Sequence, residues 1–245
     1  MPELPPTPAR LPAIDLARGL ALCAMACFHI AWDLSLFGLI AVDVAADPGW
    51  QSFARLVAGS FLALSGVGLT LATRHGLRPR RFLTRLARIA AAAALVSLAS
   101  WWFDPAGFIF FGILHCMALA AILTLPLLRA PAWLIAPLAL LMFGGGALLR
   151  DPAFNAPAWL FLGLATKVPP SADYIPLFPW FGVVLGGMLA GRWLLHDQGG
   201  PLWRWKASGR PARALAWAGR HSLAIYLLHQ PILIGLLLAI MPLLR

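Results

Sequence analysis

Residues 12–37, with the sequence PAIDLARGLALCAMACFHIAWDLSLF, form an apolar run long enough to cross a membrane as one helix. The charged residues of this run, Asp15, Arg18 and Asp33, stand toward its ends. Further runs of similar length follow, and a helix satisfies every backbone polar group of a segment that lies inside a bilayer. We therefore expect an all-α, polytopic membrane helix bundle with about seven transmembrane helices.

Short loops separate the apolar runs. We predict the spans at residues 12–37, 50–73, 82–102, 106–128, 131–149, 176–195 and 214–243. The chain is 61% hydrophobic and 11% charged, with a mean hydropathy of +0.81, whereas a soluble domain carries roughly 25% charged residues. We expect a single transmembrane domain over residues 1–245, with a short cytoplasmic segment at 1–11 and an outer interfacial loop at 150–175.

The formal net charge of +10 comes from basic residues that cluster between the spans. The loop at 74–81 holds four arginines, and the loop after residue 195 is basic too, so both loops and the N-terminus should be cytoplasmic. This placement makes the lipid bilayer the expected partner and argues against nucleic acid. The cysteines lack zinc-type spacing, so no metal is expected.

Three histidines, His29, His115 and His229, fall at membrane depth in the predicted spans and are candidate catalytic residues. His29 lies about 16 Å along its helix from Arg18, and His115 lies about 14 Å from Ala106. His229 is fifteen residues into the last span, again near mid-depth. The three imidazoles are predicted to converge on a polar cavity. The alternative is that each one bonds to a neighbouring helix and only packs.

Asp33 follows His29 by four residues and therefore shares its helix face. A carboxylate in this position can hold one ring nitrogen and raise the basicity of the other. Asp33 is thus a candidate catalytic residue that orients His29. The alternative is that Asp33 marks the outer end of the helix and pairs with Arg55.

Asp15 and Arg18 lie one turn apart at the cytoplasmic end of the first span, where Arg18 can meet a phosphate arriving from the cytosol. We assign both to donor binding, with a purely structural Asp-Arg pair as the alternative. Asp173 and Trp180 are candidate substrate-binding residues near the outer entrance, although Trp180 also fits an interfacial aromatic belt. The glycines of the second and sixth spans indicate close helix packing.

Six blocks of sequence occur in an order that resembles a known family. They are 14–21 (IDLARGLA), 28–34 (FHIAWDL), 61–66 (FLALSG), 111–116 (FGILHC), 173–182 (DYIPLFPWFG) and 219–231 (GRHSLAIYLLHQP). Together they resemble bacterial proteins that carry the heparan-alpha-glucosaminide N-acetyltransferase catalytic domain. The spacing of Asp15, Arg18, Gly19 and His29 is also similar to that of type 3 membrane acyltransferases, which implies a catalytic role for His29.

The resemblance implies a multi-pass acetyltransferase of a bacterial inner membrane, with acetyl-CoA as the cytoplasmic donor and a sugar-like hydroxyl or amine as the acceptor. His29 would deprotonate the acceptor or carry the acyl group, while His115 and His229 supply a second proton or hydrogen bonds. Arg18 would hold the nucleotide phosphates, and Asp173 would meet the acceptor. The oligomeric state stays open, with a homodimer as one option.

Two other classes of function fit the membrane-embedded histidines. A proton-coupled transporter would relay protons through them and accumulate its substrate without modifying it. A structural membrane subunit would keep its function when all three histidines are replaced by glutamine.

Overall fold

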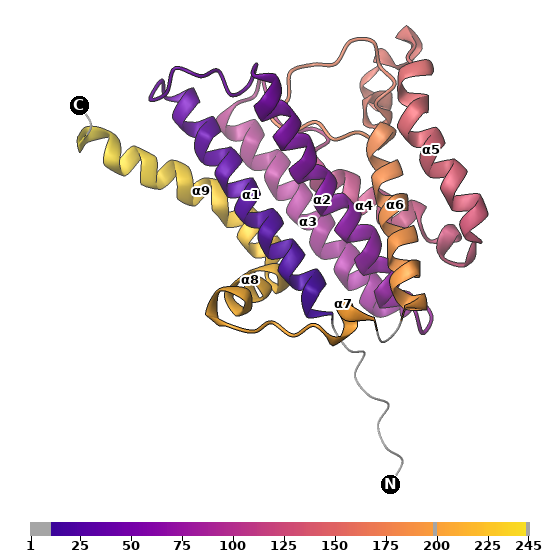
Figure 1. Ribbon diagram of the computed structural model, residues 1–245. Coiled ribbons are helices and arrows are strands. Elements are labelled where there is room, and N and C mark those ends of the chain that lie inside the picture. Colours follow the sequence, from indigo (N-terminus) through magenta and orange to yellow (C-terminus); the bar gives the residue numbers. More distant parts are fainter. Residues whose placement is uncertain (1–10, 198–199, 244–245) are drawn as a thin grey trace. The chain divides into compact units, whose positions relative to one another are not determined.

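The computed structural model describes residues 11–197 and 200–243. The expected cytoplasmic segment at 1–11 lies outside the described residues, except for Leu11. The described part of the chain is helical and has no β-strand, apart from one isolated bridge between Phe111 and Tyr174 (Figure 1). The all-helical prediction is confirmed.

The helices follow one another along the chain with 3-10 turns between some of them. They are α1 (Pro12–Leu36), α2 (Pro48–Thr73), α3 (Pro79–Phe103), α4 (Ile113–Leu123), α5 (Ala132–Leu148), α6 (Leu177–His196), α7 (Pro201–Arg204), α8 (Arg210–Arg220) and α9 (Ser222–Ile240). The 3-10 turns are η1 (Pro126–Arg129), η2 (Pro152–Asn155), η3 (Pro157–Leu162) and η4 (Met241–Leu243).

Among the described residues, five helices are long and apolar enough to cross a membrane: α1, α2, α3, α6 and α9. Helices α4 and α5 are apolar but shorter. Large apolar side chains such as Trp102, Phe103 and Leu148 are exposed on these helices, as expected where lipid rather than water is the solvent. The chain is therefore a multi-pass membrane protein.

Three of the long helices, α1, α2 and α3, begin where the sequence places proline. Pro12, Pro48 and Pro79 each occupy the first turn of a helix, where a missing backbone N–H costs no hydrogen bond. The Asp47 carboxylate also caps α2 by accepting a hydrogen bond from the Trp50 N–H at 2.8 Å. These local signals explain why the predicted bounds of the first three spans lie close to the observed ones.

The predicted span at 106–128 is wrong. Residues 104–112 form a loop, and α4 begins only at Ile113. Pro105, Gly107 and Gly112 interrupt the segment, and the Ile109 backbone bonds to serine side chains of α3 instead of to its own helix. His115 is therefore the third residue of a short helix, and the depth of about 14 Å inferred from a continuous helix no longer applies.

The predicted last span, 214–243, is also wrong, because the chain breaks at His221. The residues before this break form α8, an amphipathic helix, and those after it form α9. The His221 N–H and ring Nδ1 both bond to the Trp217 carbonyl and close the end of α8. His229 is thus the eighth residue of α9 rather than the sixteenth of one long helix.

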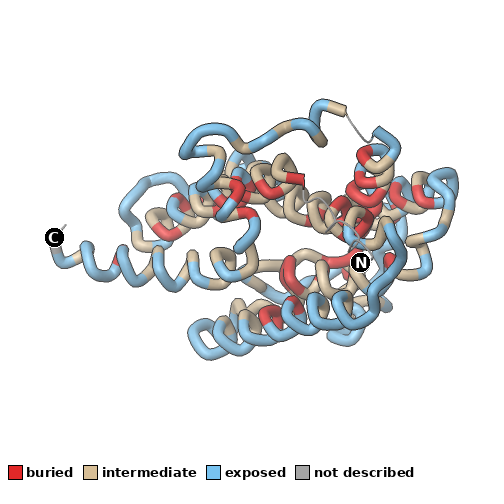
Figure 2. The backbone as a smooth tube through the Cα atoms, turned by 90° about the horizontal axis from the view of Figure 1, so that it is seen from below, coloured by how far each residue is buried: buried red, intermediate tan, exposed pale blue. Residues whose placement is uncertain are grey.

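The chain forms two compact units, and each is described by itself. The first unit holds Met1–Leu39 and Asp197–Arg245, and the second holds Ile40–His196. Within the first unit, α8 lies beside the first part of α1 (Figure 1). Exposed and half-buried residues alternate along α9, the helix that leads to the C-terminus (Figure 2), and Leu237 is its one buried residue.

In the first unit, glycines allow the backbones of α1 and α8 to touch. A Cβ atom on Gly19 would overlap the Leu215 carbonyl, and a Cβ atom on Gly219 would overlap the Asp15 carbonyl. Gly19 and Gly219 are both buried. Gly19 therefore allows another backbone to approach α1 closely, and α8 is the helix that approaches.

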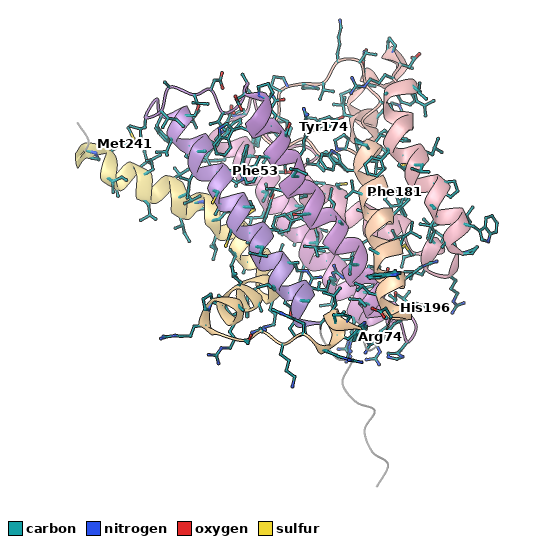
Figure 3. The ribbon with its side chains drawn as sticks, in the orientation of Figure 1. Phe53, Arg74, Tyr174, Phe181, His196 and Met241 are labelled. Atoms are coloured by element: carbon teal, nitrogen blue, oxygen red, sulfur yellow. The ribbon has the colours of Figure 1, made fainter. Side chains whose placement is uncertain are left out.

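In the second unit, the same type of contact joins α2 to α6. A Cβ on Gly66 would overlap the Val184 carbonyl, and one on Gly187 would overlap the Ala63 carbonyl. The two helices run parallel, because Arg74 after α2 and His196 at the end of α6 lie at the same end of the unit (Figure 3). The predicted close packing of these glycines is confirmed.

The neighbouring glycines of α6 allow a direct test of this contact. Gly187→Ala should destabilise the protein by about 1–3 kcal/mol, because its Cβ meets the Ala63 backbone, which cannot move aside easily. Gly186→Ala is the matched control, since nothing lies within 4 Å of its Cβ, and it should be neutral or stabilising by up to about 1 kcal/mol. Thermal unfolding in detergent measures both. Equal changes in the unfolding temperature for the two substitutions would contradict the close contact between Gly187 and the Ala63 backbone.

Candidate active site

The first unit brings two of the three predicted histidines together. His29 lies on α1 and His229 on α9, and their ring centroids are 4.7 Å apart with an angle of 62° between the ring planes. Two positive charges at this separation would repel each other, so at least one ring stays neutral and keeps a lone pair. The pair therefore offers a nitrogen base within an apolar helix bundle.

The orientation of His229 is set by its own helix. Its Nδ1 lies 2.5 Å from the Tyr226 carbonyl oxygen, and a carbonyl only accepts hydrogen bonds, so Nδ1 carries the proton. In the neutral ring Nε2 is then an acceptor, and this buried atom has no partner among the described residues. His229 is held in one tautomer with its basic nitrogen unpaired.

Asp33 is almost fully buried, with 3% of its surface exposed. Its Oδ1 accepts a hydrogen bond of 2.7 Å from the Gln230 side-chain nitrogen, and its Oδ2 has no partner in the described part of the chain. Asp33 therefore does not hydrogen-bond His29, contrary to the expectation from their spacing on one helix face. Gln230, on α9 next to His229, takes that place instead.

Three buried atoms of this cluster are unpaired acceptors: Asp33 Oδ2, His229 Nε2 and Gln230 Oε1. In the described residues, no other buried side-chain nitrogen or oxygen lacks a partner. Leaving such groups unpaired costs about 1–3 kcal/mol each. A cluster that presents only acceptors is complementary to a molecule that brings O–H or N–H donors.

The second unit places His115 in a complete hydrogen-bond chain. The Gly112 N–H donates to His115 Nδ1 at 3.2 Å, so the neutral ring carries its proton on Nε2. Nε2 lies 3.2 Å from Ser97 Oγ, and Ser97 donates in turn to the Ile109 carbonyl at 2.6 Å. Both ring nitrogens are occupied, so His115 fixes the loop between α3 and α4. Its predicted convergence with His29 and His229 stays a prediction.

Asp173 fastens a second loop to the start of α4. Its Oδ2 accepts the Ile113 N–H at 2.9 Å, and Gly112 leaves the space that this carboxylate needs. Burial raises the pKa of the Asp173 carboxyl from its ordinary 3.8 to about 6, and the Ile113 hydrogen bond offsets part of that rise. Beside it, the Tyr174 hydroxyl donates to the Leu160 carbonyl at 2.6 Å, in the loop that precedes α6 (Figure 3).

The family model described as heparan-alpha-glucosaminide N-acetyltransferase, catalytic, matches residues 10–231. The chain belongs to this family. The match includes His29, His115, Asp173 and His229. No curated protein and no solved structure matches the chain. Membership and the apolar helices together make the chain a membrane protein of the acetyltransferase kind.

The family uses acetyl-CoA as its donor in general. In this member, Arg18 forms an ion pair with Asp15 at 3.3 Å, and Asp15 is 8% exposed. The Asp15–Arg18 pair that was expected if the two residues are purely structural is thus present. A quarter of the Arg18 side chain remains exposed, so its guanidinium can still reach an anion while it stays beside Asp15.

One predicted residue, Trp180, and two residues that the sequence analysis did not single out, Gln230 and Ser97, remain to be placed. Trp180 is half-buried, with its ring 3.7 Å from where a Cβ of Gly59 would stand, so it packs toward α2. Sequence reasoning missed Gln230 and Ser97. The signal for Gln230 was its position next to His229, and the signal for Ser97 was a hydroxyl within an apolar run. In the described residues no group of acidic, cysteine and histidine side chains could hold a metal.

The raised pKa of Asp173 predicts a pH dependence of stability. A folded-state pKa above the ordinary value means that the folded state binds the proton more tightly than the unfolded state. The contribution of protonated Asp173 to the free energy of unfolding is therefore fully present below about pH 4 and is lost as the pH rises through about 6. Asp173→Asn keeps an acceptor for the Ile113 N–H but carries no charge. Relative to wild type it should gain about 2–3 kcal/mol between pH 4 and pH 7.

Thermal unfolding midpoints at both pH values measure this gain. Asp151→Asn is the control for the general effect of removing one carboxylate, because Asp151 is exposed in the same unit. A difference between Asp173→Asn and wild type that stays constant over this range would contradict the burial argument.

Proposed function

We propose that the chain transfers an acetyl group from cytoplasmic acetyl-CoA to a hydroxyl or amine of a sugar-like acceptor, at or across a bacterial inner membrane. In this proposal α4 and α5 complete seven membrane segments, and the N-terminus is cytoplasmic. The arginines at the end of α2 then face the cytosol, and the loop that carries Tyr174 lies at the opposite end of its unit (Figure 3).

The observation that carries the proposal is the cluster of His29, Asp33, His229 and Gln230. It combines an imidazole pair with acceptors that lack partners, on the apolar helices α1 and α9. An acetyl acceptor brings O–H or N–H groups, and one of them must lose a proton when it attacks a thioester. The cluster supplies both the base and the hydrogen-bond acceptors that such a molecule needs.

In the proposed reaction, His29 removes the proton of the acceptor hydroxyl or amine as this group attacks the acetyl carbonyl carbon. The new C–O or C–N bond forms, the C–S bond breaks, and the CoA thiolate takes the proton back from the imidazolium. His229, fixed by its bond to Tyr226, accepts a hydrogen bond from the acceptor through Nε2. Arg18 contacts the donor phosphates from the cytoplasmic end of α1.

In the proposed reaction Asp33 has an electrostatic role and does not hydrogen-bond His29. Its carboxylate is fixed by Gln230 and stabilises the imidazolium that forms nearby. His115 and Asp173 contribute by holding the loops around the start of α4. Trp180 and Asp173 remain candidates for acceptor binding.

Labelled acetyl-CoA, incubated with the purified protein and extracted envelope glycans, tests the proposal. His29→Gln should lower acetyl transfer about 100-fold or more, because the general base is lost. His196→Gln is the control, since His196 is exposed at the end of α6. If the folded wild-type protein transfers no label, the enzyme proposal fails. Accumulation of an unmodified solute driven by a proton gradient would instead favour the transporter.

A second prediction concerns Gln230. Gln230→Leu removes the acceptor Oε1 and leaves Asp33 Oδ1 without its donor, so kcat/KM for the acceptor should fall about 10- to 100-fold. The KM for acetyl-CoA should stay unchanged. Gln51→Leu, which removes a glutamine bonded to Ala45 in the other unit, should leave both constants unchanged. A rise in the KM for acetyl-CoA alone would place Gln230 in donor binding.

A further inference from the structure

Helix α8 has two faces of opposite character. Ala216 and Gly219 are buried on one face, against α1. Arg210, Arg213, Trp217 and Arg220 are exposed, and their spacing of three, four and three residues places them on one stripe of the helix. We name these four residues the α8 basic face.

The α8 basic face belongs to a segment of one charge sign. Residues 200–243 contain Arg204, Lys206 and the three arginines of the α8 basic face, and no aspartate or glutamate. None of these three arginines forms an ion pair with a described residue; the Arg213 Nε–H bonds only to the Gly209 carbonyl of its own first turn. The positive charge of this face is therefore not neutralised within the described part of the protein.

Trp217 gives the face its second property. It is 55% exposed, and its ring packs on His221 with centroids 4.5 Å apart. An indole flanked by arginines on a short helix is typical of a segment that lies in the headgroup region of a membrane. Eleven residues with three arginines are too few and too charged to cross the bilayer.

We propose that the α8 basic face binds the headgroups of anionic phospholipids. The arginines meet the lipid phosphates, and Trp217 lies at the boundary between headgroups and acyl chains. Nucleotide phosphates carry the same charge, but the face points away from α1, the helix that presents Arg18 for the donor. Because the α8 basic face points away from α1, anionic lipid at the membrane surface fits it better than the donor nucleotide does.

The binding site is coupled to the rest of the first unit by the contact between Gly19 and Gly219. Because the backbones of α1 and α8 touch there, α8 cannot shift along α1 without breaking that contact. A lipid held by α8 therefore also fixes the height of α1, which carries His29, relative to the membrane surface. This inference does not depend on the proposed acetyl transfer.

Binding of phosphatidylglycerol to the purified full-length protein in detergent, followed by native mass spectrometry, tests the inference. The variant R210Q/R213Q/R220Q should bind phosphatidylglycerol about 100-fold more weakly than wild type, and phosphatidylcholine equally. The matched control R78Q/R80Q/R81Q, here called the loop control, removes one exposed arginine just before α3 and two from the first turn of α3. It should change phosphatidylglycerol binding by less than about threefold.

Two further arms decide between the remaining outcomes. R210K/R213K/R220K keeps the charge and should retain phosphatidylglycerol binding, which guards against a loss caused by misfolding. Equal losses in the α8 glutamine variant and the loop control, or no loss in either, would overturn the inference. A loss of CoA affinity in the α8 glutamine variant with phosphatidylglycerol binding intact would also overturn it, because the face would then hold nucleotide.

Discussion

The hydrogen bond between Gln230 and Asp33 is the interaction on which the candidate site depends. It joins α9 to α1 across 197 positions of sequence, next to the contact between the His29 and His229 rings. Because Asp33 is an acceptor only, the bond also fixes which end of the Gln230 amide faces it. This contact therefore sets the direction of the free Asp33 Oδ2 and Gln230 Oε1, whereas the Tyr226 carbonyl sets that of His229 Nε2.

The second unit uses polar side chains differently. Ser97, His115 and Asp173 have backbone groups as partners, and they tie the loops at 104–112 and 171–175 to α3 and α4. The Ile175 N–H and the Ala172 N–H bond to the Phe111 and Gly107 carbonyls and join the two loops directly. In this unit polar groups stabilise non-helical backbone, whereas in the first unit they remain available for a ligand.

Hydropathy and helix-start signals were enough to predict the membrane class and the first three helices. The predicted run at 12–37 differs from α1 (Pro12–Leu36) at one end by a single residue. Hydropathy failed at 106–128 and at 214–243, because an apolar loop held by the serines of α3 and the amphipathic helix α8 both look like parts of a span. The partner of Asp33 could not be predicted, since helix spacing relates residues of one helix only.

The acceptor-only character of the cluster bears on how a product would leave. An alcohol loses its O–H when it becomes an acetyl ester, and a primary amine loses one N–H when it becomes an amide. On the proposed reaction the product therefore offers one hydrogen-bond donor fewer to Asp33, His229 and Gln230 than the molecule that entered. The site would hold its product less tightly than its substrate, so turnover would be favoured by the same unpaired atoms that attract the acceptor.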